Sequence, residues 1–304
     1  MLPLNFNHLY YFYIVAKRGS FSQASTDLRI SQSSISVQIK QFETSLGHIL
    51  FHRVKTGVEL TESGQILFEY ADAAFHDIER IQDALEAVEH QIRGSISIGT
   101  VTSIGIYILP EVLKGFHRDF PEVKISIDVK SPRDLIDWVK LGKIDFAILT
   151  SNRQYPDLIG VPLKKNKLFL VAPREHPLAG GTNVSPAELE KYPFLAFEEG
   201  MELRVMMDAL FRRMSIGVEY VMASTNVATF KHMALAGLGL AILPEAAIGD
   251  EIRSGDLVRV DMPALYMVQE ITAYYKSNRP LTPTRKQFLE AMQQNLARKH
   301  PLKR

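Results

Sequence analysis

Hydrophobic positions divide the chain into three zones that repeat with different periods. Residues 1 to about 65 contain short helical patterns separated by glycines, and residues 66–93 form one long helical pattern without glycine or proline. From residue 94 onward, strand-like runs alternate with amphipathic helices, which is the pattern of an α/β sheet domain. The sequence therefore predicts a multidomain α+β protein with an all-α head over 1–65, a linker helix over 66–93 and an α/β domain over 94–304.

The linker segment has apolar residues at alternating intervals of four and three, which is the spacing of a coiled-coil heptad. A helix that packs only on its own globular core usually shows a wider apolar stripe. Acidic residues crowd the other faces of this helix. Packing on the protein's own core remains the alternative, but the pattern favours self-association. The predicted dimerisation seam is Leu67, Ala71, Ala74, Ile78, Ile81, Leu85, Val88 and Ile92.

The third zone predicts two similar α/β units in succession. Its first part alternates strands and helices in the order β-α-β-α-β, which implies a mainly parallel sheet. The pattern then resets near residue 168 and runs to a buried strand over 238–243. Two such units suggest two lobes, and α/β proteins commonly bind small ligands between lobes.

The first zone predicts a helix–turn–helix followed by a wing. Ser31 is placed to begin a helix whose apolar stripe is Ile35, Ile39, Phe42 and Leu46. The opposite face is short and polar, so it could enter a DNA major groove. A hairpin with Gly57 at its tip follows over 51–60. The candidate DNA-binding residues are Ser22, Ser31, Gln32, Ser33, Ser36, Val37, Gln38, Lys40, Arg53 and Lys55.

Composition narrows the possible chemistry. The chain has no cysteine, which excludes disulfide frameworks, zinc fingers and thiol redox sensing. Its net charge of +1 does not by itself indicate a nucleic-acid partner. Basic character is local, because residues 1–65 hold six Lys or Arg and four Asp or Glu, against two and seven in residues 66–93. No signal peptide or membrane-spanning run is visible, so we expect a cytoplasmic protein without a membrane partner.

Several stretches resemble the LysR-type transcriptional regulators. The head matches over Gly19–Ala24, over Leu28–Glu43 and over Leu60–Gly64, and the run Ala236–Pro244 is similar to the family's effector domain. The resemblance implies double-stranded DNA as a partner, a homodimer or homotetramer, RNA polymerase as a possible contact, and no cofactor. Two positions depart from the family. Ser33 stands where proline is common, and Val37 stands where a basic residue is common, so we hypothesise that Val37 touches a thymine methyl group.

The family's effector domain is similar to the periplasmic binding proteins, with two lobes and two crossing strands. This implies crossings near 162–167 and 271–275, with lobe I about 94–163 and 271–304 and lobe II about 164–270. Thr102 and Ser103 would begin a helix of lobe I, where free N–H groups and hydroxyls favour an anion. The candidate effector-binding residues are Thr102, Ser103, Ser131, Thr150, Thr225 and Asn226. Each could equally be an ordinary helix cap; together they favour a small polar or anionic effector.

Two other functions fit parts of the sequence less well. Catalysis is not expected, because Val101–Gly105 only approaches a nucleophile elbow and Gly237–Gly239 lacks the third glycine of a dinucleotide loop. His48 and His52 have a metal-ligand spacing, but Gly47 ends the helix that would align them, so no metal site is expected. A solute-binding protein of a transport system is the alternative for the third zone. It would need export, and the DNA-reading head argues against it.

Overall fold

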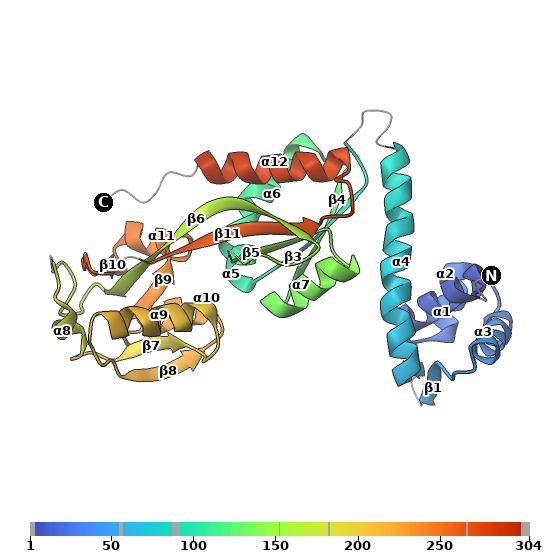
Figure 1. Ribbon diagram of the computed structural model, residues 1–304, viewed down its shortest axis with the longest axis horizontal. Coiled ribbons are helices and arrows are strands. Elements are labelled where there is room, and N and C mark those ends of the chain that lie inside the picture. Colours follow the sequence, from blue (N-terminus) through green and yellow to red (C-terminus); the bar gives the residue numbers. More distant parts are fainter. Residues whose placement is uncertain are drawn as a thin grey trace. The chain divides into compact units, whose positions relative to one another are not determined.

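The computed structural model describes residues 4–54, 57–86, 92–151, 153–181, 183–265 and 267–298, with the backbone alone at 79, 80, 82–86 and 298. The chain divides into two compact units, residues 1–85 with 141–143, and residues 86–140 with 144–304. Figure 1 shows the first unit as a set of helices with a short hairpin and the second as a long sheet flanked by helices. Among the described residues, no helix is both long and apolar enough to cross a membrane.

The head consists of three helices and a hairpin, in the predicted order. The elements are α1 (Phe6–Arg18), α2 (Phe21–Leu28), α3 (Gln32–Leu46), β1 (Phe51–Val54) and β2 (Gly57–Leu60). Ser20 and Ser31 cap α2 and α3, because their hydroxyl oxygens accept hydrogen bonds from the backbone N–H groups at the helix starts. The predicted stripe of Ile35, Ile39 and Phe42 is buried in the head core, so the helix–turn–helix is confirmed.

The hairpin confirms the predicted wing but corrects its turn. The strands β1 and β2 are antiparallel, and Val54 pairs with Gly57, so Gly57 begins the second strand instead of forming the tip. A side chain at Gly57 would collide with the carbonyl of Gly19, which accepts a hydrogen bond from Val58 N at 3.0 Å. Glycine is therefore needed here for the close approach of two backbones. The head is not entirely helical, because this hairpin belongs to it.

The linker helix α4 (Glu62–Glu86) begins four residues earlier than predicted. Thr61 starts it, because its hydroxyl accepts a hydrogen bond from Gly64 N at 2.9 Å. The predicted helix end is wrong in one respect. Ile92 lies in non-helical chain and packs against the core of lobe I, so it does not extend the heptad pattern. Val88 lies outside the described residues.

Lobe I of the second unit is built on three parallel strands, with β3 between the other two. They are β3 (Ser95–Thr100), β4 (Lys124–Val129) and β5 (Phe146–Thr150). One face of this sheet packs against α6 (Leu109–Asp119) and the final helix α12 (Pro283–Arg298). The other face packs against α7 (Pro132–Leu141). The predicted docking of Phe288, Leu289, Met292 and Leu296 on lobe I is confirmed by their burial in this core.

Two long strands cross from one lobe to the other. These are β6 (Leu158–Pro173) and β11 (Met267–Lys276), which pair antiparallel along the whole length of β11. The first half of β6 lies in lobe I, where β11 also pairs with β5. The second half lies in lobe II, where β6 pairs with β9 and β10. The predicted outbound crossing near 162–167 falls within β6 (Figure 1). The predicted return near 271–275 falls within β11 but already in lobe I, because 271–274 pair with β5, so β11 passes between the lobes before residue 271.

Lobe II completes the second unit. Its remaining elements are α8 (Pro186–Leu189), β7 (Phe194–Phe197), α9 (Glu202–Arg213), β8 (Tyr220–Ser224), α10 (Val227–Leu235), β9 (Ala241–Pro244), α11 (Glu245–Ser254) and β10 (Leu257–Arg259). The strands β7 and β8 form a small parallel sheet of their own. Phe194, Phe197 and Phe230 are fully buried in a core that also includes the second half of β6.

Candidate functional site

The exposed face of α3 carries most of the predicted DNA-binding residues. Gln32, Ser33 and Lys40 are exposed, and Val37 leaves 53% of its surface open. Ser36 and Gln38 are half-buried at the flanks of this face. Val37 is the exposed apolar side chain of this polar face, and an apolar side chain at a DNA interface can contact a thymine methyl group.

The start of α3 offers donors that fit a phosphate. Ser31 Oγ accepts a hydrogen bond from Ser34 N at 3.2 Å and lies 3.1 Å from Ser33 Oγ. Ser31 is therefore partly committed as a helix cap, while both hydroxyls stay exposed. The helix dipole and the first backbone N–H groups favour an anion at this end.

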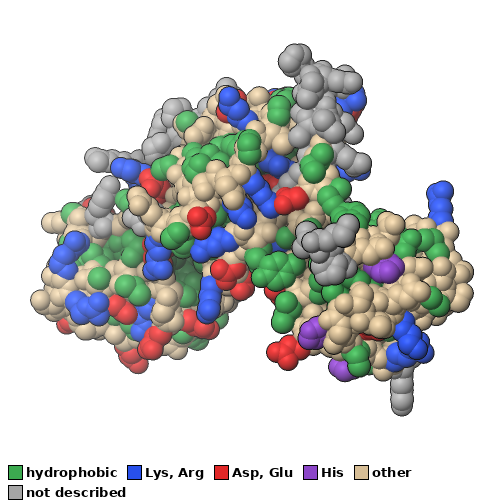
Figure 2. Space-filling model, turned by 45° about the vertical axis from the view of Figure 1, so that its right-hand side comes forward, with side chains coloured by type: hydrophobic (Ala, Val, Ile, Leu, Met, Phe, Trp, Pro, Cys, Tyr) green, Lys and Arg blue, Asp and Glu red, His purple; other side chains and the backbone are tan. Residues whose placement is uncertain are grey.

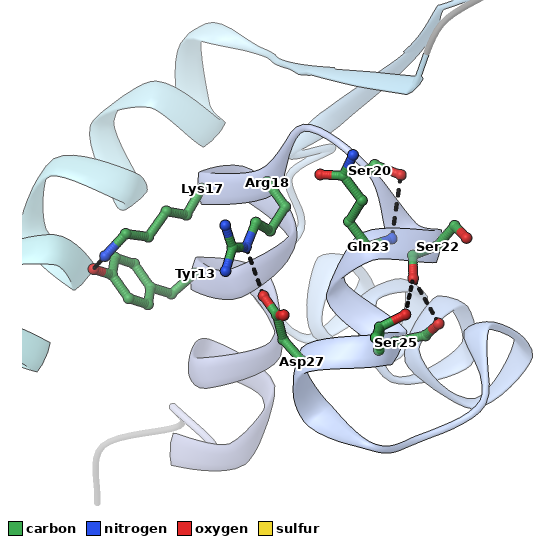
Figure 3. A network of polar contacts seen from close by, with 9 residues as sticks. Tyr13, Lys17, Arg18, Ser20, Ser22, Gln23, Ser25 and Asp27 are labelled. Atoms are coloured by element: carbon green, nitrogen blue, oxygen red, sulfur yellow. Dashed lines mark hydrogen bonds and ion pairs between the residues drawn. The ribbon is translucent and has the colours of Figure 1, made fainter.

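The start of α2 lies in the polar network of Figure 3. The carbonyl of Ser22 accepts hydrogen bonds from the hydroxyls of Ser25 and Thr26, whereas the Ser22 side chain is exposed. Arg18 forms a 2.5 Å ion pair with Asp27, which ties α1 to α2 (Figure 3). In the wing, Arg53 is exposed, and Lys55 lies outside the described residues.

The free face of α4 differs from the predicted seam. Leu67 is half-buried against the head core, and Ala71 is 1% exposed against α1, so the head covers part of the predicted seam. The exposed apolar residues are Ile66, Tyr70, Ile78 and Ile81, with Ala74 half-buried between them. The side chain of Leu85 lies outside the described residues. In the first turns of α4, the exposed apolar stripe is therefore rotated relative to the predicted seam, because α1 covers part of the predicted face.

The predicted effector residues of lobe I lie at the carboxyl ends of its strands. Thr102 and Ser103 begin α5 (Thr102–Tyr107), just after β3, and Thr150 ends β5; all three are half-buried. Because β3 and β5 are parallel neighbours, these ends meet at one edge of the sheet. Ser131 differs, since its hydroxyl caps α7 by bonding Asp134.

The predicted residues of lobe II stand before α10. Asn226 is a helix cap, because its side-chain oxygen accepts a hydrogen bond from Ala228 N at 2.8 Å. Thr225 beside it is exposed. For Ser131 and Asn226, the cap role foreseen as the alternative is therefore present in the structure, and their oxygen atoms are partly used by it.

Sequence reasoning missed a buried polar cluster at the same edge of lobe I. The carbonyl of Ser151 accepts hydrogen bonds from Thr272 Oγ1 at 2.6 Å and from Tyr274 OH at 3.2 Å. Thr100 is fully buried and donates to the carbonyl of Ile148. These residues lie on strands far apart in sequence, so no local pattern could have grouped them.

Lobe II brings a carboxylate to this region. Glu202 begins α9, and burial raises its pKa, although the positive charge of Arg153 from lobe I acts in the opposite direction. Arg153 is exposed, and its carbonyl accepts a hydrogen bond from Tyr274 OH at 2.8 Å. The positive charge of Arg153 on lobe I thus acts on the carboxyl of Glu202 on lobe II, and Arg153 lies in the chain just beyond Thr150 and Ser151.

A second polar contact joins the lobes through α5. Lys231 on α10 forms a 2.5 Å ion pair with Glu251 on α11 and lies 5.0 Å from the ring centre of Tyr107 on α5. Burial opposes the charge on Lys231, but the bonds to Glu251 and Tyr107 outweigh it and raise its pKa. The same helix α5 begins with Thr102 and Ser103, so the contact links the candidate effector residues to lobe II.

Figure 2 shows no single large charged patch on the face that it draws. On the visible face of the second unit, acidic and basic side chains are interspersed, and the visible face of the head is mostly uncharged (Figure 2). Within the described residues, no group of three or more His, Asp or Glu side chains could hold a metal ion.

Comparison with known proteins identifies both parts of the chain. A model of the bacterial regulatory helix-turn-helix proteins of the lysR family matches residues 6–65, and a model of the LysR substrate binding domain matches residues 89–297. The second match alone covers more than half of the chain. This protein belongs to the LysR family of transcriptional regulators.

Two of the similar proteins align over nearly the full length of this chain, and a third covers two thirds of it. The RuBisCO operon transcriptional regulator of Allochromatium vinosum is 26% identical over 299 residues, which are 98% of this chain and 99% of that protein. The structure of full-length CbnR complexed with its target DNA has a TM-score of 0.70 at 20% identity, covering 96% of this chain and 100% of that one. The regulatory domain of CcmR from Synechocystis PCC6803, in complex with 2-PG, has a TM-score of 0.60 at 20% identity and covers 67% of this chain and 98% of that one.

The family assignment decides between the functions considered from the sequence. The relatives are regulators of transcription, so the chain is a LysR-type transcriptional regulator and not a solute-binding protein of a transport system. Its two-part fold, a winged helix–turn–helix head and an α/β effector domain, is the one predicted.

We predict that Lys231→Met lowers the free energy of unfolding by about 2 kcal/mol, because it leaves a largely buried carboxylate without its cation. The side chains of Lys231 and Glu251 are only 12% and 16% exposed, and Glu251 Oε2 has no hydrogen-bond partner. Adding Glu251→Leu should recover most of this loss, as measured by chemical denaturation. If the double variant is as unstable as Lys231→Met, packing and not charge accounts for the loss.

Proposed function

We propose that this LysR-type regulator binds operator DNA as a homo-oligomer and that a small polar or anionic effector bound between its lobes changes its action on transcription. The observation that carries the proposal is the exposed polar face of α3 on a capped and buried helix–turn–helix. RNA polymerase is a further candidate partner. Because its target would be chromosomal DNA, the proposed place of action is the cytoplasm.

The DNA-binding role rests on the chemistry of the exposed α3 residues. Gln32 and Lys40 can hydrogen-bond base edges or phosphates, and Ser33 can do so without keeping the helix away from the groove. Arg53 of the wing supplies a charge beside the duplex. The structural neighbour CbnR, which has the same fold, was solved with its target DNA. Catalysis forms no part of the proposal.

We predict that Val37 recognises the methyl group of one thymine in each half-site. An operator is first selected from a random-sequence duplex library, and each thymine is then replaced by uracil, which removes only the methyl group. Uracil at one position should lower the affinity of the wild-type protein about fivefold, because the loss of one buried methyl contact has about this effect.

The matched variants separate this contact from general effects. Val37→Ala should lose the sensitivity at that position, whereas Ile49→Ala, which removes another exposed apolar side chain of the head, should keep it. Val37→Arg tests the same point. If it binds more tightly with an unchanged preference at every position, Val37 takes no part in readout.

Self-association is supported by the free stripe of α4. Tyr70 leaves 69% and Ile81 leaves 58% of its surface open, although both lie on a helix whose opposite side is packed against α1. Large apolar side chains aligned on one helix face are more often covered by a partner than left in water. A second copy of α4 is the natural partner, because its stripe has the same character.

We predict that Ile81→Glu raises the dissociation constant of the dimer by about tenfold or more, because it places a charge in an apolar contact. Sedimentation equilibrium measures this directly. Gln65→Glu introduces the same side chain on the polar face of the same helix and should leave the dimer intact. Equal behaviour of the two variants would remove α4 from the interface.

Effector binding is supported by the meeting of polar groups from both lobes. Thr102, Ser103 and Thr150 lie at one edge of lobe I, and Glu202 of lobe II interacts with Arg153 across the boundary. The free N–H groups of a strand-to-helix turn favour an anion, and Arg153 would add positive charge. A ligand that binds one lobe arrangement better than another shifts the population towards it. The regulatory domain of CcmR, which shares the fold, was solved with 2-PG.

We predict that a small carboxylate or phosphate stabilises the full-length protein against heat. A ligand present at about 100 times its dissociation constant adds about 2.7 kcal/mol, so a screen by thermal shift detects it. Ser103→Ala should weaken that shift, whereas Ser254→Ala, at the end of α11, should leave it unchanged. Identical shifts in both variants would place the ligand away from the start of α5.

A further inference from the structure

One helix of the head connects the recognition helix to the linker helix. On one side of α1, Phe12 and Val15 are fully buried, and the Phe12 ring lies 6.3 Å from the Phe42 ring of α3. On the other side, Tyr13 is 5% exposed and packs against Ala71 and Phe75 of α4. Because α1 packs against both helices, its packing on α4 sets the direction of α3 relative to α4.

Aromatic stacking holds α1 in this position on α4. The Tyr13 ring lies between two rings of α4, at 5.7 Å and 19° from Phe68 and at 4.8 Å and 29° from Phe75. Phe6 and Tyr10, on the same side of α1, also place their rings within 5.3 Å and 5.2 Å of Phe75. Such stacking is strong but tolerant, because rings can slide past each other over a broad range of offsets at small cost.

A hydrogen bond within the stack is less tolerant. Tyr13 OH donates to Asp72 Oδ1 at 3.1 Å and accepts from Lys17 Nζ at 3.0 Å (the Lys17 bond is drawn in Figure 3). Asp72 is itself oriented, because His76 contacts both its carbonyl, at 2.9 Å, and its carboxylate, at 3.7 Å. A hydrogen bond to a carboxylate requires a short distance and a narrow range of angles, so it fixes one register of α1 along α4.

We propose that the Tyr13–Asp72 hydrogen bond sets the angle between the recognition helix and the linker helix, and that Tyr13 is thereby a positioning residue for the operator half-site spacing that the dimer accepts. This rests on the proposed function, since a half-site spacing exists only for an oligomer that binds DNA through two heads. In such a dimer the linker helices fix the two subunits, and a small rotation of each head moves the two recognition helices along the duplex. The geometry of base contacts demands a defined separation of the half-sites.

The test compares operators whose two half-sites are moved apart or together by one and two base pairs, with a single half-site as reference. The wild-type protein should bind the best spacing about tenfold more tightly than a spacing two base pairs away. Tyr13→Phe keeps the ring stack and removes the hydroxyl. It should reduce this discrimination to about threefold or less. Its affinity for the single half-site should change by less than about twofold, because α3 itself is untouched.

Three further variants make the outcome specific. Tyr11→Phe removes a hydroxyl from the same helix, but the hydrogen bond to Asp72 comes from Tyr13 and not from Tyr11. This variant should therefore retain the wild-type dependence of affinity on half-site spacing. Asp72→Ala should match Tyr13→Phe, whereas Asp72→Asn keeps the accepting oxygen and should retain the profile. The double variant Tyr13→Phe/Asp72→Ala should be no worse than either single variant, as expected for two partners of one bond.

The alternative results are distinct. If Tyr13→Phe keeps the wild-type spacing profile, the proposal is wrong. If it loses single half-site affinity and thermal stability in equal measure, Tyr13 has only a structural role, and the proposal is likewise overturned. If the wild-type protein shows no spacing preference at all, it does not bind two half-sites as a dimer. In that case the proposed function on which this inference rests also fails.

Discussion

The antiparallel pairing of β6 with β11 is the constraint on which the effector domain depends. These two strands are the segments that pass between the lobes, and each contributes side chains to both cores. Leu168 and Met267 belong to the lobe II core, while Ile271 and Ala273 belong to the lobe I core. Between them the buried amides Asn166 and Gln269 stand opposite each other. Any change in the lobe arrangement must be absorbed by this short paired segment, because the strands on either side are held in packed cores.

The candidate effector region draws its residues from the ends of the strands that this pairing organises. Ser151 is held against β11 by Thr272 and Tyr274, and this fixes the chain just beyond Thr150. Lobe II adds Glu202, and α5 is held to lobe II by Tyr107 and Lys231. The lobe arrangement and the position of α5 are thus connected through neighbouring contacts. The proposed effector site lies on these contacts, and such a connection is what an effector needs in order to shift a conformational population.

The head follows the same logic on a smaller scale. The helix α1 is buried on two sides, with Phe12 towards α3 and Tyr13 towards α4. A helix that contributes to two contacts cannot adjust one without disturbing the other. The recognition face of α3 is therefore positioned by the packing of α1 and α4, although no residue of that packing is part of the exposed α3 face.

Much of the fold could be predicted from the sequence, and the errors have a common cause. Ser20 and Ser31 are recognisable helix caps, and the period of Ile35, Ile39 and Phe42 marks a buried helix face. Along the linker helix, the predicted seam residues Leu67 and Ala71 pack against the head, while Ile66 and Tyr70, which the heptad spacing leaves out, are exposed. Similarly, a strand-end serine or asparagine can cap a helix or bind a ligand, and only the structure shows Ser131 and Asn226 as caps.

The sequence by itself determined the order of the elements, the helix–turn–helix, the two-lobed plan and the absence of any thiol chemistry, since these depend on local periodicity, capping residues and composition. The tertiary structure decided which apolar face of α4 stays free, and it brought Tyr13 to Asp72 and Arg153 near Glu202. The reason is physical. Periodicity states that one face of an element is to be buried, but the partner that buries it comes from a distant part of the chain and is fixed only when the cores pack.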